Sequence, residues 1–75
     1  MPPLPILSAP RLIGALELAG FVAVRQRGSH VRLKHPDGRV VTVPSHGAQD
    51  IGRGLLRKIL RDAELTVEDL DRLLK

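Results

Sequence analysis

The chain has 75 residues, of which 43% are apolar and 27% charged, a balance typical of a folded globular protein. This length predicts one small domain, residues 1–75, and excludes a large enzyme with a deep closed pocket. The absence of cysteine excludes disulfides and thiolate metal sites, and the single aromatic residue, Phe21, argues against a protein that stacks successive bases on aromatic rings.

The first seven residues form a proline-rich lead that we expect to be flexible. Prolines stand at positions 2, 3 and 5, and the segment has neither a basic start nor a continuous apolar stretch. It therefore resembles neither a signal peptide nor a membrane span. We expect a cytoplasmic protein with no membrane partner.

A short amphipathic helix is predicted after the lead. Ser8 is suited to the N-cap, Pro10 to the first turn and Gly20 to the C-cap. Between these positions, apolar residues recur at helical spacing. They are Leu12, Ile13, Leu16 and Ala19.

Three strands are predicted in the middle of the chain. Residues 21–27 are rich in β-forming side chains and are broken by Gly28, which is suited to a turn or a bulge. A second run spans about 29–35 and a third spans 39–43, where a proline closes it. The Pro-Asp-Gly sequence at 36–38 is a compact turn signal. These runs predict an antiparallel meander.

Two helices are predicted to follow the strands. Residues 51–63 carry an apolar stripe with basic residues on the other side. The stripe consists of Leu55, Leu56, Ile59, Leu60 and Ala63. Thr66 is suited to cap a short final helix. The predicted fold class is therefore α+β, a small single domain with a three-stranded antiparallel sheet and helices packed on one face.

Positive charge is concentrated in the middle of the chain. The formal net charge is +4, but residues 1–20 contribute zero, residues 21–61 contribute +7 and residues 62–75 contribute −3. A basic segment of this kind is typical of proteins that meet phosphates, although it also fits a merely solvated basic surface.

Strand alternation makes His30 the main candidate for chemistry. Side chains two residues apart share a face of a strand, so His30, Arg32 and Lys34 lie on one face and Val31 and Leu33 on the other. The apolar pair must cover the core, which turns the imidazole to solvent among cations. Arg25 and Arg27 on the neighbouring strand are expected beside it. Imidazole exchanges protons near neutral pH, which suits it to acid–base chemistry.

The remaining candidate residues carry weaker signals. Ser29 points to the opposite face from His30, so it is expected to fix the local backbone rather than form a triad. His35 is interpreted as a surface residue at a strand end. His46 either caps the second helix or supplies a second proton-transfer group. The histidines lack the spacing of a zinc site, and residues 47–54 lack the Lys-Ser/Thr of a nucleotide-binding loop, so no metal or cofactor is expected.

Several segments, taken in order, resemble the HicA toxin family of bacterial toxin–antitoxin pairs. The resemblance covers nearly all of the chain beyond the lead. It rests on Gly20-Phe21, Arg27-Gly28-Ser29-His30, His35-Pro36-Asp37-Gly38, Thr42-Val43-Pro44, His46, Gly54-Leu55-Leu56-Arg57-Lys58-Ile59-Leu60 and Thr66. The chain departs from the family pattern at Val31, at Leu55, where Thr is common, and at Ala63-Glu64, where an Ala-Gly step is frequent.

The resemblance implies a double-stranded-RNA-binding-domain-like fold and an endoribonuclease that cleaves mRNA with a histidine on the central strand. The matching residue is His30. The resemblance also implies inhibition by a HicB-type antitoxin and leaves DNA binding to that partner. Arg25, Arg27, Arg32 and Lys34 are the candidates for RNA contacts, and Gly28 and Ser29 for positioning the backbone of the site.

Two other functions remain open at this point. A non-catalytic module could use the same basic face to bind duplex RNA by shape and phosphate contacts. An interaction protein could pair its basic surface with an acidic partner. A helix-turn-helix DNA-binding regulator is disfavoured, because the sequence has no such pattern.

Overall fold

The computed structural model describes residues 3–45, 47 and 49–75 and has three helices and three strands within them. In chain order these are α1 (Ala9–Leu18), β1 (Val22–Arg27), β2 (His30–Lys34), β3 (Val40–Pro44), α2 (Arg53–Ala63) and α3 (Val67–Leu73). The strands form one antiparallel sheet in the order β1-β2-β3. The predicted α+β class and element order are confirmed, and the arrangement agrees with the double-stranded-RNA-binding-domain-like fold that the resemblance implies.

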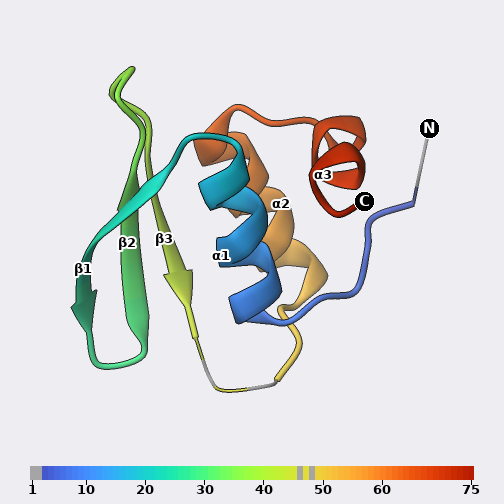
Figure 1. The fold of residues 1–75 in the computed structure, drawn as a ribbon. Helices are drawn as coiled ribbons and strands as arrows, with labels where there is room; N and C mark the ends of the chain where they lie inside the picture. Colours follow the sequence, from blue (N-terminus) through green and yellow to red (C-terminus); the bar gives the residue numbers. More distant parts are fainter. Residues whose placement is uncertain (1–2, 46, 48) are drawn as a thin grey trace.

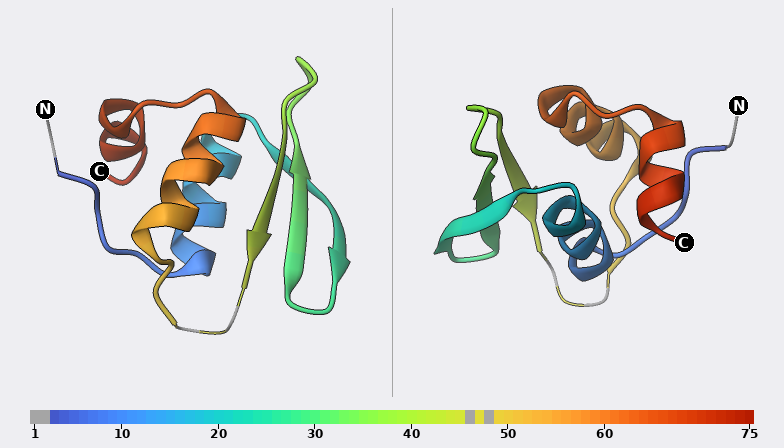
Figure 2. Two further views of the ribbon diagram at one scale, coloured as in Figure 1. Left: turned by 180° about the vertical axis from the view of Figure 1, so that it is seen from behind. Right: turned by 45° about the horizontal axis from the view of Figure 1, so that its top comes forward.

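The helices lie on one side of the sheet, and its other face is open. α1 and α2 lie side by side against the sheet, and α3 packs against α1 (Figures 1 and 2). The core lies between these layers and contains only apolar residues among those described. Its largest fully buried side chains are Phe21, Leu12, Leu16, Leu33, Leu56, Ile59, Leu70, Val41 and Val43. Because the helices lie on one side of the sheet, the polar side chains of its other face remain in solvent.

Strand β1 departs from regular alternation. All six of its residues are exposed, including Val22 and Val24. The pairing with β2 shifts between Ala23 and Arg25, which leaves Val24 as the extra residue of a β-bulge. β1 forms the edge of the sheet that lies farthest from α2 (Figure 1). Its side chains on the core side therefore find little helix surface to pack against.

The end of the proline-rich lead packs against the domain. Leu7 is buried, and its carbonyl oxygen accepts a hydrogen bond of 2.9 Å from the backbone N–H of Ile51. Ser8 forms an isolated bridge with Asp50 and takes the N-cap position of α1 without a side-chain hydrogen bond. The lead, expected to be flexible, is thus attached to the core at its C-terminal end.

His35 is more enclosed than the sequence indicates. Only 20% of its side chain is exposed, its ring meets the ring of Phe21 edge to face at 5.1 Å, and its Nε2 lies 3.2 Å from the carbonyl oxygen of Ala19. Its Nδ1 lies 3.1 Å from the backbone nitrogen of Asp37 and 3.0 Å from the Asp37 carboxylate. The interpretation of His35 as a surface residue is therefore wrong, because it joins the turn 36–38 to the end of α1.

Arg39 completes this structural cluster. Its guanidinium lies 5.1 Å from the centre of the Phe21 ring and also donates to Asp37 and to the carbonyl oxygen of Ala63, at the end of α2. The hydrogen bonds from the Arg39 side chain and backbone hold the pKa of the Asp37 carboxyl below its usual value. Arg39 therefore belongs to the scaffold rather than to the open face.

At the start of α3, the predicted cap is confirmed. The Thr66 side chain accepts a hydrogen bond from the Asp69 N–H, and the Asp69 carboxylate accepts one from the Thr66 N–H, which forms a capping box. The bonds from Thr66, the backbone N–H first, lower the pKa of Asp69.

Candidate functional site

A two-residue turn between β1 and β2 sets the position of His30. Arg27 and His30 are paired directly across the hairpin, and Gly28 and Ser29 form the turn between them. Gly28 has φ +59°, whereas Ser29 has no positive φ, which is the pattern of a type II′ turn with glycine at its first central position. The Ser29 carbonyl oxygen also accepts a hydrogen bond from the Ser45 N–H beyond β3. The turn that joins β1 to β2 is thereby also bonded to the residue that follows β3.

The alternation predicted for the second strand is confirmed. Val31 and Leu33 are buried under the helices, whereas His30, Arg32 and Lys34 are exposed on the other face. Cross-strand pairing places Arg25 opposite Arg32 and, as stated above, Arg27 opposite His30. The strand pleat thus gathers side chains from β1 and β2 on the open face of the sheet.

These side chains line a shallow hollow, which we call the cationic hollow. It is formed by Arg25, Arg27, His30, Arg32 and Thr42. Lys34 lies on the same face, but it is paired with Val22 and Val40 and does not line the hollow. In the described part of the chain, no ion pair involves Arg25, Arg27, Arg32 or Lys34. Their charges are therefore free to meet an anion.

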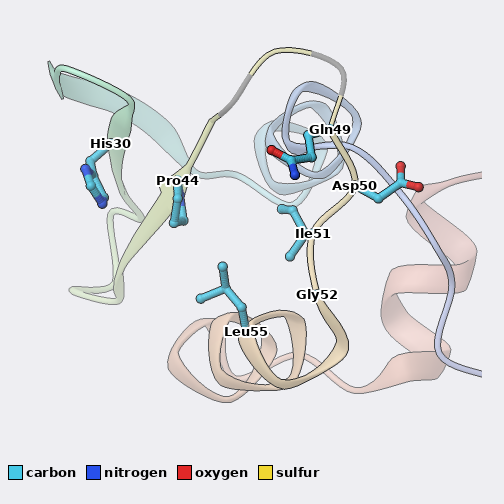
Figure 3. A pocket seen from close by; sticks show the side chains of 7 residues that line it. All are labelled: His30, Pro44, Gln49, Asp50, Ile51, Gly52 and Leu55. Carbon is cyan, nitrogen blue, oxygen red and sulfur yellow. The ribbon is translucent and has the colours of Figure 1, made fainter.

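A second hollow also borders His30. This space, which we call the loop pocket, has a volume of about 370 Å³ and lies between the end of β3 and the start of α2. Its described lining is His30, Pro44, Gln49, Asp50, Ile51, Gly52 and Leu55 (Figure 3). Sequence reasoning missed it, because it forms where segments separated along the chain approach each other. Leu55, assigned to the core stripe, is 37% exposed and faces this space.

The predicted site residues do not all come together. His30, Arg25, Arg27 and Arg32 share one hollow, whereas Lys34 lies farther along the sheet. His46 lies outside the described residues. Across the described ranges, no group of three or more histidine, aspartate or glutamate side chains is arranged to hold a metal ion. The arrangement brings an exposed imidazole beside three guanidinium groups, which can hold a phosphate next to a proton-transfer group.

A family model described as the HicA toxin of bacterial toxin–antitoxin pairs matches residues 9–65, which include every element except α3. No curated protein matches the chain. Among the helices of residues 3–45, 47 and 49–75, none has the length and apolar character needed to cross a membrane. The matched range contains both hollows and the whole sheet.

Proposed function

This chain belongs to the HicA toxin family of bacterial toxin–antitoxin systems, and on that premise we propose that it is an endoribonuclease that cleaves mRNA without a metal ion. Membership in the family gives the toxin role and implies an antitoxin partner. The observation that supports the nuclease assignment best is that His30 lines the same hollow as Arg25, Arg27 and Arg32. Such a hollow can hold a phosphodiester against an imidazole.

In the proposed reaction, His30 moves a proton at the cleaved phosphodiester. The ribose 2′-oxygen loses its proton and attacks phosphorus, the bond from phosphorus to the 5′-oxygen breaks, and that oxygen gains a proton. The products are a 2′,3′-cyclic phosphate and a 5′-hydroxyl, so no external reactant is needed. His30 serves one of the two proton transfers, and another group or a water serves the second.

The basic side chains hold the RNA and stabilise the developing charge. Arg25, Arg27 and Arg32 surround the proposed phosphate position, and Lys34 extends the positive face toward a neighbouring phosphate. Gly28 and Ser29 fix the backbone on which the imidazole stands. A HicB-type antitoxin is the proposed inhibitor. Because the site is an open face rather than a closed pocket, a protein partner can cover it directly.

The decisive experiment incubates a defined transcript with purified wild-type or His30→Ala protein in EDTA. The wild type should shorten the transcript, and the variant should lose at least about 10²-fold in rate, which is the lower end of the contribution of a proton-transfer group. His30 is exposed, so the variant should retain the wild-type circular dichroism spectrum and melting temperature. Cleavage by His30→Ala at the wild-type rate would contradict the assignment, as would cleavage that stops in EDTA.

The same experiment separates nuclease activity from simple RNA binding. A non-catalytic module that used the exposed cations of the sheet would retain duplex RNA in a gel-shift assay and leave it intact. That outcome for the wild-type protein would replace the nuclease proposal with the binding one. Coexpression with the gene product encoded next to this chain should suppress growth arrest if that product is the antitoxin.

A further inference from the structure

We propose that the loop pocket binds one unpaired RNA base next to the cleaved phosphate and gives the enzyme a base preference. The inference rests on the proposed function, because it takes His30 as the group at the cleaved bond. Its volume of about 370 Å³ lies within the range of about 300–1,000 Å³ that is typical of small-molecule sites. The residues that would bind the base are Pro44, Gln49, Ile51 and Leu55.

The position of His30 connects the pocket to the phosphate site. Its side chain lines both the cationic hollow and the loop pocket. A nucleotide has a phosphate and a base joined through one sugar, so it presents an anion and a flat, largely apolar ring to neighbouring sites. With the phosphate among the three arginines, the base of the same strand can enter the loop pocket, which the same imidazole lines.

The walls of the pocket suit the face of a base. Pro44, Ile51 and Leu55 supply aliphatic surface from three separate segments (Figure 3). Leu55 remains 37% exposed, although the adjacent Leu56 is fully buried in the core. Flipped or splayed bases are held between aromatic or apolar side chains. This chain has no aromatic residue other than the buried Phe21, so aliphatic contacts are the ones available.

The polar rim of the pocket can read the edge of the base. The Gln49 amide is directed toward the Pro44 side of the pocket, whereas the Asp50 carboxylate points away from it (Figure 3). The carboxylate is thus turned away from an incoming phosphate. An amide offers a donor and an acceptor together, and glutamine pairs in this way with the N6 and N7 atoms of adenine. Adenine is therefore the expected preferred base.

The charge of the neighbouring hollow favours a nucleotide over an apolar peptide side chain. Three arginines and no acidic residue are among its described lining residues. A peptide that filled the loop pocket through an apolar side chain would leave this charge unmatched unless it also carried acidic groups. A nucleotide satisfies both spaces with one molecule.

The test maps cleavage sites in a transcript for the wild type and two pairs of matched variants. Gln49→Leu should reduce the preference at one position beside the cleaved bond by at least about 5-fold, as expected for loss of a bidentate contact. Gln26→Leu makes the same change on β1 and should leave the preference intact. Leu55→Ala should reduce cleavage at preferred sites, whereas Leu18→Ala, at a 74% exposed position of α1, should not. Identical site distributions for the wild type and all four variants would overturn the inference.

A binding measurement tests the pocket whether or not the protein cleaves RNA. The wild-type protein with labelled methyl groups is titrated with adenosine 3′-monophosphate, which it cannot cleave, and, separately, with ribose 5-phosphate, which has no base. The Leu55 and Ile51 methyl resonances should shift with the nucleotide only. Equal shifts with both probes, or none with either, would overturn the inference. If the antitoxin shifts these resonances and neither probe does, the pocket belongs to the protein interface, and the inference is also overturned.

Discussion

Replacing Gly20 with Ala tests the close junction between α1 and the sheet. Gly20 has φ +104°, a backbone conformation that residues other than glycine rarely adopt. A Cβ atom at this position would also lie 2.7 Å from the Nε2 of His35, which hydrogen-bonds to the carbonyl oxygen of Ala19. The methyl group would therefore impose backbone strain and displace the histidine ring.

The two effects have separate magnitudes. A residue forced into a sparsely populated backbone region costs about 1–3 kcal/mol. Loss of the His35 hydrogen bond adds about 0.5–1.5 kcal/mol, because a typical internal hydrogen bond contributes about that much. We expect Gly20→Ala to lower the free energy of unfolding by about 2–4 kcal/mol. In a His35→Ala background the clash is absent, so only the backbone cost should remain.

Urea denaturation followed by circular dichroism measures these changes. Gly14→Ala is the matched control, since Gly14 lies within α1 and a Cβ there meets nothing within 4 Å. It should stabilise the protein by about 0.8–1 kcal/mol through helix propensity. The reasoning is refuted if Gly20→Ala changes the free energy of unfolding by less than 1 kcal/mol. A cost that is the same with and without His35 would refute the steric part alone.

Two further predictions concern the end of α2 and two carboxylates with lowered pKa values. Glu64 has φ +57° after α2, so Glu64→Gly should raise the free energy of unfolding by about 1 kcal/mol, and an unchanged urea midpoint would contradict this. The pKa of Asp37 is lowered chiefly by the Arg39 side chain, and the pKa of Asp69 is lowered chiefly by the Thr66 backbone. Each carboxylate therefore stabilises the fold above its ordinary pKa of 3.8. This stabilisation is lost as the pH falls through the lower pKa of the folded state. Urea midpoints measured between pH 6 and pH 2 should therefore fall at the acid end, less steeply for Asp37→Asn, and equal slopes would count against the Asp37 contribution.

The parts of the fold governed by local rules could be predicted from the sequence. The alternation of His30, Val31, Arg32 and Leu33 fixes two faces because β2 is the central strand with one side against the helices. Its apolar residues have only one place to be buried, so the outward direction of His30 follows. The resemblance to the HicA family points to the same histidine.

The features that depend on distant segments could not be predicted. Leu55 and Leu56 are adjacent and equally apolar, and only the position of α2 relative to the end of β3 decides that one is buried and the other lines the loop pocket. His35 looks like a surface residue until the end of α1, 16 residues away, supplies the carbonyl oxygen of Ala19. The irregular exposure of β1 likewise follows from its place at the sheet edge and from its bulge.

The fold distributes the +7 charge of residues 21–61 over two faces of the domain and an internal cluster. Arg39 is engaged by Asp37 and by the end of α2, and Lys58 is paired with Asp62. Arg53, Arg57 and Arg61 lie on α2, which packs on the other face of the sheet from the cationic hollow. At physiological ionic strength charges are screened over about 8 Å, and the domain measures 34 × 29 × 20 Å, so these helix cations act weakly at the open face. Under the proposed function, the side chains on β1 and β2 are therefore the ones placed to hold the phosphate, and His30 is the imidazole among them.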